Sequence, residues 1–454
     1  MRFLFRPHPV KLPFKLTIDQ QLKLSYAYLL KWVVLAVLAG VAGSLVVHSF
    51  VYLFSAIRAL VGPLGLPAPV WALAGALIVG AGIYSLQPHA AGEGIPSYIR
   101  GIRIHEGDLL FSVSFFKYWA ALLTLATYGN GGVVGPLGRV SAGAVSFIAR
   151  HLPKLRVGFT AQDQRTAAIC GLSAAVGTIF HTSLGAGIFA VEIIQRAKMG
   201  YRDLFPAILS STTAVFVCKS IGWQSFYQID AADQFMNIDM IGWLLLLAVL
   251  TGMAGGLYTN FYALVSRVIK RKEGNVVLKV LGGSAAAALL AWAVNPELLG
   301  TSTNFISAIF SGDMAVLSGR AGFVRSTGLI LLVMLVCKVA CNCITVGSGM
   351  SAGFTGPAAI AGMLLGASLA TFLNLDGASA TYHAFVAAGF AGLLASVMNI
   401  PLAAAVMTTE IFGLQYSFPA GLAAIVGFQV TRAKTIYDYA LAGAGLSLDE
   451  QDAA

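Results

Sequence analysis

Long apolar segments recur along the whole chain and constrain its fold more than any other feature. Trp32–Phe54 and Met240–Tyr258 each approach or exceed the roughly 20 residues that a helix needs to cross a bilayer. Further segments of this kind are Val70–Leu86, Phe115–Tyr128, Val277–Val294, Gly328–Val346 and Ala384–Met407. A barrel strand needs only about 10 residues of alternating polarity, so these longer runs predict helices. The sequence therefore predicts an all-α polytopic membrane protein.

The composition agrees with a membrane location. Charged residues make up 11% of the chain and hydrophobic residues 57%, whereas an average soluble chain carries about 25% charged residues. So little charge cannot cover a water-facing surface, which excludes a soluble enzyme, a nucleic-acid binder and a disordered protein. Glycine is also in excess, with 50 residues among 454.

Basic residues gather at the start of the chain and in its short connections. Residues 1–31 contain six lysines and arginines but a single acid, Asp19. By the positive-inside rule, we expect 1–30 to be a basic cytoplasmic segment. We also expect 441–454 to be a short cytoplasmic tail and the membrane to be a bacterial inner membrane. Contact with anionic lipid headgroups accounts for the net charge of +10 without a nucleic-acid partner.

The sequence predicts no catalytic, metal or cofactor site. It contains no H-E-x-x-H, G-x-S-x-G or P-loop lysine motif. The cysteines are odd in number and all lie inside apolar segments, where they are interpreted as small buried side chains rather than as a disulfide framework. They are Cys170, Cys218, Cys337, Cys341 and Cys343.

An internal repeat organises the chain. Gly129–Gly138 matches Gly347–Gly356 without a gap, and the same offset in the numbering, 218 (347 − 129), aligns Gly171–Ile194 with Gly389–Phe412. Such a match predicts a duplication, with a first transmembrane repeat over 31–220 and a second over 221–440. Duplicated membrane chains often place their binding site where the two halves meet.

Glycine-rich segments in both halves predict helix breaks at membrane depth. Gly129–Gly138 would unwind a helix, and a helix restarting at about Arg139 would direct free N–H groups and a positive dipole end into a cavity. Such a cavity binds an anion without a full positive charge. Glycine also serves close helix packing, but the recurrence of the cluster, together with Gly92–Pro96, favours the anion site.

Those segments resemble motifs of the CLC family of chloride channels and anion/proton exchangers. Gly92-Glu-Gly-Ile-Pro96 resembles the family's G-S-G-I-P, and Gly135-Pro-Leu-Gly138 stands where the family has G-R-E-G-P. Gly353-Phe-Thr-Gly-Pro357 resembles G-x-F-x-P, and Tyr437 stands where the family has a pore-lining tyrosine. The resemblance implies a CLC-like fold of two inverted-topology repeats, whose broken helices meet at the membrane midplane. It also implies a homodimer with one anion pathway per subunit, both termini in the cytoplasm and, here, no CBS domains.

The resemblance also implies which residues bind the anion, with the Tyr437 hydroxyl closing the inner side of the site. These residues are Gly94, Ile95, Gly135, Pro136, Leu137, Gly138, Phe354, Thr355, Gly356 and Tyr437.

Two departures from the family pattern concern proton handling. Leu137 stands where the family has its gating glutamate, and Ile193 stands where exchangers have an inner proton-transfer glutamate. Pro136 replaces the family arginine, and an arginine appears instead at Arg139. Apolar side chains cannot carry protons, so the sequence favours channel-like, uncoupled passage of the anion.

Glu93 departs from the pattern in the opposite direction, because the family has serine there. An intramembrane carboxylate is a functional candidate, and we hypothesise that Glu93 is a displaced gate, closed when ionised and open when protonated. The alternative is that its side chain turns away into a hydrogen bond or ion pair outside the pore. Arg139 could raise the local positive potential, or it could pair with Glu93 or with headgroups.

Three further polar residues have structural interpretations. Glu192 and Glu410 occupy equivalent repeat positions near helix ends, which favours one hydrogen-bonding role common to both halves. Lys338 either snorkels or is buried with an acid.

Three functions therefore stay open: an uncoupled anion channel, an anion/proton antiporter that uses Glu93, and a non-conducting membrane scaffold. The expected partners are membrane lipids and chloride or another small anion such as fluoride, nitrate or bicarbonate. The sequence does not distinguish between these anions.

Overall fold

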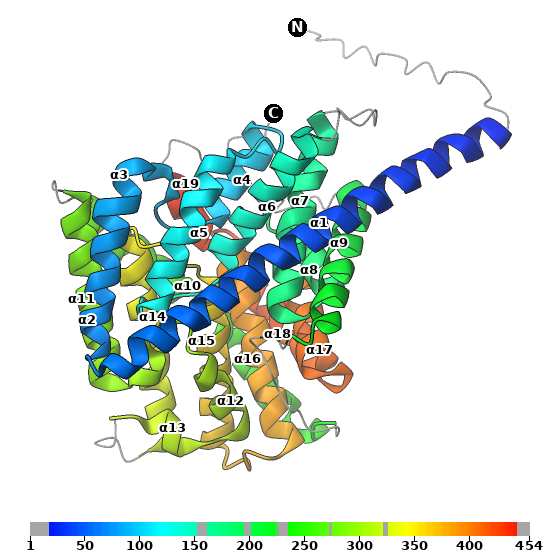
Figure 1. Cartoon of the computed structure of the whole chain (residues 1–454). Coiled ribbons are helices and arrows are strands. Elements are labelled where there is room, and N and C mark those ends of the chain that lie inside the picture. The colour runs from blue at the N-terminus through cyan, green and yellow to red at the C-terminus, as the bar shows by residue number, and fades with distance from the viewer. Residues whose placement is uncertain are drawn as a thin grey trace, which may run out of the picture.

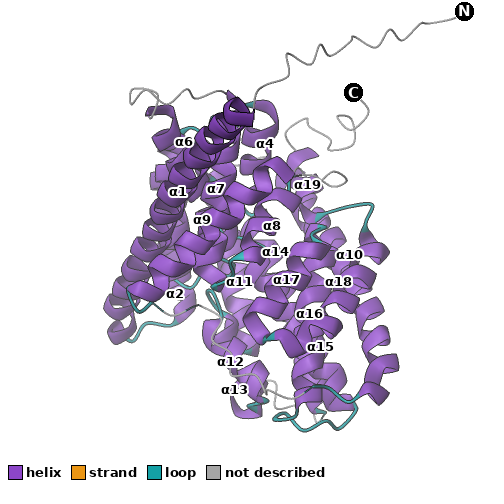
Figure 2. Ribbon diagram, turned by 90° about the vertical axis from the view of Figure 1, so that its right-hand side faces the viewer, coloured by secondary structure: helices purple, strands orange, loops and turns teal. Residues whose placement is uncertain are grey.

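The computed structural model describes residues 18–151, 161–194, 201–223, 225, 235–271, 275–320 and 326–442. Within these ranges the chain forms helices joined by loops and no strand (Figure 2). Most of the expected basic segment 1–30 and all but the first two residues of the expected tail 441–454 lie outside the described ranges.

The helices follow one another with short connections, some of them single turns of 3-10 or π helix. The α-helices are α1 Ile18–Val61, α2 Ala68–Leu77, α3 Tyr84–Leu86, α4 Ile95–Ile104, α5 Phe111–Ala126, α6 Val134–His151, α7 Ala161–Phe180, α8 Leu184–Glu192, α9 Tyr201–Ser220, α10 Ile241–Arg271, α11 Val276–Val294, α12 Thr303–Ser311, α13 Met314–Ser318, α14 Thr327–Gly347, α15 Thr355–Phe372, α16 Ala380–Met398, α17 Pro401–Phe412, α18 Ser417–Thr431 and α19 Ile436–Ala442.

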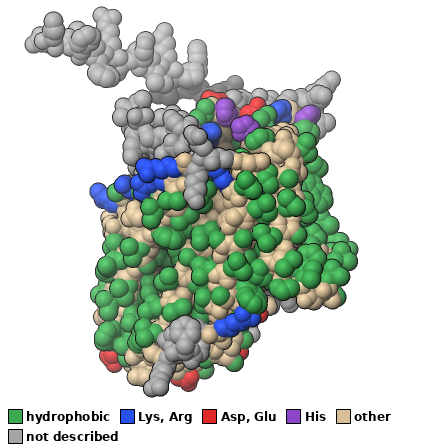
Figure 3. Space-filling view, turned by 90° about the vertical axis from the view of Figure 1, so that its left-hand side faces the viewer, with side chains coloured by type: hydrophobic (Ala, Val, Ile, Leu, Met, Phe, Trp, Pro, Cys, Tyr) green, Lys and Arg blue, Asp and Glu red, His purple; other side chains and the backbone are tan. Residues whose placement is uncertain are grey.

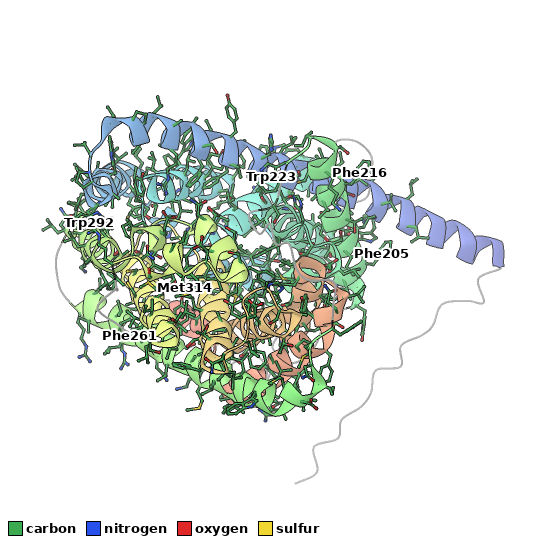
Figure 4. All side chains as sticks on the ribbon, turned by 90° about the horizontal axis from the view of Figure 1, so that it is seen from below. Phe205, Phe216, Trp223, Phe261, Trp292 and Met314 are labelled. Carbon is green, nitrogen blue, oxygen red and sulfur yellow. The ribbon has the colours of Figure 1, made fainter. Side chains whose placement is uncertain are left out.

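The outer surface is that of a membrane protein. Seven helical segments in the described ranges are long and apolar enough to cross a bilayer. Hydrophobic side chains cover the middle of the molecule, and charged side chains gather toward its upper and lower edges (Figure 3). Large aromatic side chains such as Phe205, Phe216 and Trp292 lie on the perimeter (Figure 4), where Phe216 is 71% exposed. The expected all-helical membrane fold is confirmed.

Helix α1 runs obliquely across the front of the molecule (Figure 1). The apolar segment Leu29–Leu64, which joins most of α1 to the 3-10 turn that follows it, has 36 residues, a length of about 54 Å at 1.5 Å per residue. The hydrocarbon core is only about 30 Å thick. The oblique path accommodates the excess length.

Glycine allows the central helices to pack backbone against backbone. A Cβ atom on Gly362 of α15 would lie 2.2 Å from the Gly389 carbonyl oxygen of α16, and one on Gly389 would lie 2.1 Å from the Gly362 oxygen. Helix α16 is almost wholly buried as a result. Part of the glycine excess therefore serves close helix packing, as in other membrane bundles.

The two halves match in structure, but at two different offsets. Helices α6 and α15 both have 18 residues, and their first residues, Val134 and Thr355, give an offset of 221 (355 − 134). Glu192 and Glu410 at the ends of α8 and α17 give an offset of 218 (410 − 192). The sequence alignment carried the second offset into the glycine-rich segments, where it is wrong by three positions. The chain from the start of α6 to Glu192 is three residues longer than the chain from the start of α15 to Glu410 (192 − 134 = 58 against 410 − 355 = 55), which accounts for the difference between the offsets.

Glu192 and Glu410 confirm the common role expected from the repeat. Glu192 accepts hydrogen bonds from Leu402 N (3.1 Å) and Ala403 N (2.7 Å) at the start of α17. Glu410 accepts from Ser183, Leu184 and Gly185 N at the start of α8. Each carboxylate therefore caps the free N–H groups of a helix in the opposite half.

Candidate functional site

Helices α4, α6 and α15 direct their N-termini toward one place in the centre of the molecule. A Cβ atom on Gly94, the residue before α4, would lie 2.0 Å from the Gly135 carbonyl oxygen in the first turn of α6. Gly132 and Gly353, just before α6 and α15, exchange hydrogen bonds of 2.9 and 2.7 Å. Backbone contacts of this kind require glycine and hold the three helix starts together.

The glycine-rich segment of the first half is less unwound than the sequence suggested. Helix α6 begins at Val134 and not at about Arg139, and Leu137 N already donates to Val133 O at 3.0 Å. Gly135–Gly138 therefore form the first turn of the helix. N–H groups in a first turn have no partner within the helix, and Pro136 contributes none, so Val134 and Gly135 supply the free donors of α6.

Glu93 lies at this meeting point. Its Oε2 accepts a hydrogen bond of 2.5 Å from Ile95 N, the first residue of α4. Its Oε1 is buried without a hydrogen-bond partner among the described residues, and it lies 1.8 Å from where a Cβ on Gly135 would be. The carboxylate thus takes the Ile95 N–H that the sequence assigned to the anion, and it lies against α6.

Aromatic side chains close one side of the site. Phe354, the residue before α15, makes edge contacts with Tyr262 (4.6 Å between ring centroids) and Tyr437 (6.5 Å). Tyr437 is 1% exposed, and its hydroxyl has no hydrogen-bond partner among the described residues. It lies close enough to Thr355 and Glu93 to interact with both. The structure therefore brings the second-half residues Phe354, Thr355 and Tyr437 to the same centre as Glu93.

The two apolar replacements are buried at or beside this centre. Leu137 has no exposed surface, and Gly138 packs against Leu172 of α7. Ile193 lines a small cavity of about 10 Å³ together with Tyr437 and Glu192. Neither replacement brings an ionisable group, and among the described residues Glu93 is the carboxylate that lies against the starts of both α4 and α6.

Arg139 does not pair with Glu93. Its Nη1 donates to Ser114 Oγ of α5 at 2.7 Å, and its Nε has no partner among the described residues. The side chain is 3% exposed. Of the roles considered from the sequence, pairing with headgroups is also excluded by this burial, which leaves an effect on the local potential.

Lys117 is a residue that the sequence reasoning missed, because it lies inside a segment read as apolar. Its ammonium is fully buried and donates to the carbonyl oxygens of Ala90 (3.0 Å) and Gly92 (2.8 Å), just before Glu93. It interacts electrostatically with both Glu93 and Arg139. Its spacing was an available signal, since the interval from Lys117 to Pro136 equals the interval from Lys338 to Pro357.

Lys338 has the equivalent position in the second half. It donates to Ser302 Oγ (2.6 Å), Leu298 O (3.1 Å) and Gly300 O (3.4 Å), and it is fully buried. Both alternatives drawn from the sequence, snorkelling and burial with an acid, are therefore wrong. Backbone carbonyls and a hydroxyl solvate the ammonium instead.

The sequence of this chain also matches a model of a known protein family. Residues 75–432 match the model described as voltage gated chloride channel. The chain belongs to the voltage-gated chloride channel family. Members of this family are channels or transporters of anions rather than enzymes, so anion transport is established for the chain at the level of the family.

Individual relatives are distant but extend over much of the chain. An uncharacterised protein of Methanocaldococcus jannaschii, MJ0305, is 26% identical over 91% of this chain and 96% of its own length. A protein named chloride/fluoride channel protein from Pseudomonas syringae pv. tomato is 24% identical over 69% of this chain and 64% of its own length.

Solved structures show the same fold. A CLC-type fluoride/proton antiporter superposes with a TM-score of 0.72 at 22% identity, covering 94% of this chain and 99% of its own. A slow cyanobacterial chloride/proton antiporter superposes with a TM-score of 0.73 at 19% identity and the same coverage. Fold and family are thereby confirmed, and the CLC-like expectation from the motifs was correct.

Proposed function

We propose that this protein lets a small halide anion cross the membrane without proton coupling. The observation that carries the proposal is the convergence of the α4, α6 and α15 N-termini beside Tyr437. Free N–H groups and helix dipoles at such a point stabilise an anion in a site without a full positive charge. Of the residues inferred from the motifs, we propose that Gly94, Gly135, Phe354, Thr355, Gly356 and Tyr437 bind it, and that Ile95 becomes available once Glu93 moves. Pro136 has no N–H, and the Leu137 N–H already donates to Val133 O.

The absence of proton coupling is inferred from Leu137 and Ile193. Both side chains are buried, and neither carries an atom that accepts a proton. The relatives favour chloride or fluoride as the anion, because they include a chloride/fluoride channel protein and a fluoride/proton antiporter.

A second candidate function is proton-coupled exchange through Glu93. One observation favours it: a buried carboxylate oxygen without a partner among the described residues, at the start of α4 and against the first turn of α6. An ionised carboxylate there competes with the anion for the same N–H groups, and protonation removes the competition. Glu93 would then act as the gate and as the proton carrier.

Liposome flux separates these functions. The purified protein is reconstituted, and the reversal potential is measured under a chloride gradient with and without a pH gradient. A potential that follows chloride alone supports the uncoupled channel, whereas a constant shift with the pH gradient supports the exchanger. No flux of chloride, fluoride, nitrate or bicarbonate would leave the third function, a membrane scaffold.

The role of Glu93 has its own test in the same assay. With a gating carboxylate, flux through the wild type rises as pH falls, and Glu93→Gln carries high flux at every pH. Lys117, Tyr262 and Tyr437 also interact with Glu93, so a pH dependence that survives in Glu93→Gln assigns it to them and removes the gate. Glu410→Gln is the matched control, because that carboxylate caps α8 outside the site.

We also propose a homodimer in a bacterial inner membrane, with both termini in the cytoplasm. Helices α8, α17 and α18 present exposed apolar side chains that suit a subunit interface, among them Leu184, Leu402 and Ile425. Cross-linking of single cysteines placed on this face tests the dimer. Labelling of cysteines at the two ends of the chain from each side of the membrane tests the orientation.

A further inference from the structure

Asn342 of α14 is a buried amide next to the start of α15. Helices α10, α14 and α15 pack against one another there (Figure 1). The Nδ2 of Asn342 donates to the Gly353 carbonyl oxygen at 3.2 Å, and its Oδ1 accepts from the Tyr258 hydroxyl of α10 at 2.6 Å. Both side chains are buried. The amide therefore links α10 to the segment that leads into α15, away from solvent.

The Gly353 carbonyl receives one donor more than its counterpart in the first half. It accepts from Gly132 N at 2.9 Å and from Asn342, whereas the Gly132 carbonyl accepts from Gly353 N alone among the described residues. At the offset of 221 that also relates these two glycines (353 − 132), the counterpart of Asn342 is Ala121 of α5, which carries no donor. The pairing of the two glycines therefore does not account for the amide.

The oxygen that Asn342 holds belongs to the same peptide unit as the N–H of Phe354. The described residues contain no cis peptide bond, so this unit is trans. Its C=O and N–H lie in one plane and point in opposite directions. Two donors on the oxygen fix the rotation of that plane, so the Phe354 N–H is directed away from α14. Phe354 precedes the first turn of α15, where an N–H has no partner within the helix.

Tyr258 fixes the amide in turn. Its hydroxyl donates to Oδ1, so the amide nitrogen is left to face the Gly353 oxygen. Successive hydrogen bonds polarise one another, and the chain from Tyr258 through Asn342 to Gly353 therefore also strengthens the Phe354 N–H as a donor. The Tyr258 ring makes an edge contact with the Phe354 ring, with 6.3 Å between their centroids.

We propose that Asn342 is a positioning residue for anion binding, which directs the Phe354 N–H at the anion, and that Tyr258 acts through Asn342. Both act through the peptide unit and not by contact with the anion. The inference rests on the proposed function, which assigns the Phe354 N–H to the central site. It adds the residues of α10 and α14 that set the affinity of that site.

Chloride binding to the purified full chain, measured by titration calorimetry in detergent, tests the proposal. Asn342→Ala, which gives α14 the side chain found at the equivalent position of α5, is expected to weaken chloride binding about tenfold, as for loss of one charge-assisted contact. Tyr258→Phe removes only the hydroxyl and is expected to weaken binding about threefold. The double variant should bind chloride no more weakly than Asn342→Ala, because Tyr258 acts through that residue.

Asn295→Ala is the matched control. Asn295 is buried at the end of α11, where its Nδ2 donates to Val316 O and its Oδ1 accepts from Glu297 N, each at 3.0 Å. Both alanine variants should unfold at a lower temperature, because each leaves buried backbone groups without a partner. Only Asn342→Ala should weaken chloride binding. Unchanged chloride affinity in Asn342→Ala, or an equal loss in Asn295→Ala, overturns the positioning role.

Tyr258→Phe decides the question if Asn342→Ala does not fold. Its control is Tyr382→Phe, because the buried Tyr382 hydroxyl donates to Ile309 O at 2.8 Å, in a different part of the second half. Chloride affinity should fall in Tyr258→Phe and stay unchanged in Tyr382→Phe. The same affinity in both variants contradicts the proposal.

Failure of the proposed function gives a different result. A wild type that binds chloride but carries no flux in liposomes contradicts the proposed function, and the chloride affinities of the variants still decide the role of Asn342. A wild type that binds no chloride, fluoride, nitrate or bicarbonate contradicts both.

Discussion

Lys117 and Lys338 are buried lysines at equivalent positions of the two halves, but their surroundings differ. Each stands at the same interval before the proline of a helix that starts at the centre, and each ammonium donates to the carbonyls of the loop before a short helix, α4 or α12. Beside Lys117 stand Glu93 and Arg139. Beside Lys338 the corresponding residues are Thr301 and Ile360, which carry no charge.

The difference shows which half bears the chemistry. The scaffold is duplicated: both halves bury a lysine, cap a partner helix with a glutamate and start a helix at the centre. Only the first half adds an acid and an arginine to that scaffold. The ionisable side chains beside the proposed anion path therefore come from the first half, whereas the second half contributes the start of α15 and the Tyr437 side chain.

The largest expected effect comes from replacing the residue before α4 by the residue that stands before α12. Gly94 corresponds to Ser302, and a Cβ on Gly94 would lie 2.0 Å from the Gly135 backbone oxygen. Backbone cannot yield as a flexible side chain does, so Gly94→Ser should lower the stability by about 3 kcal/mol, at the upper end for overpacking, and abolish flux. Thermal unfolding in detergent measures the loss. Gly282→Ser is the control, since nothing lies within 4 Å of a Cβ there; equal stability of the two variants would refute backbone contact between α4 and α6.

Removing the two lysines should separate stability from transport. Lys117→Met and Lys338→Met each leave buried carbonyls without a donor, so each should lower the stability by about 2 kcal/mol. Only Lys117→Met should change the chloride dependence of flux, because only Lys117 adds potential near Glu93 and Arg139. Unfolding and liposome flux are measured on both variants. An equal change of flux in Lys338→Met would show that the halves do not differ as proposed.

The smallest effect is expected where the halves are most alike. Glu192→Gln and Glu410→Gln each weaken a helix cap by about 1 kcal/mol, and the two losses should be similar because the capping geometry is reciprocal. Unfolding midpoints of the single variants measure them. A loss confined to one variant would show that the caps are not equivalent.

The membrane-spanning helices and the features common to both halves could be predicted from the sequence. Apolar segment length predicts the helices, and the duplication led correctly to a shared role for Glu192 and Glu410. The register of the glycine segments was wrong by three positions, because glycines recur so often that several offsets match them. Leucine at 137 and glutamate at 93 are visible in the sequence, but the partner of Arg139 depends on how α5 packs on α6, and Ser114 carries no sign of that contact.

Gly132 and Gly353 occupy the same place in their respective halves, just before α6 and α15, and they bond to each other. A Cβ on Gly132 would lie 2.9 Å from Gly356 N, and one on Gly353 would lie 2.9 Å from Gly135 N. In an assembly of two identical half-length chains, this contact would join a residue to its own copy, and any mutation there would change both sides of the contact at once. A single chain that contains both halves is free of that restraint. In such a chain one half can carry Glu93 and Arg139 while the other carries neutral residues at the corresponding positions.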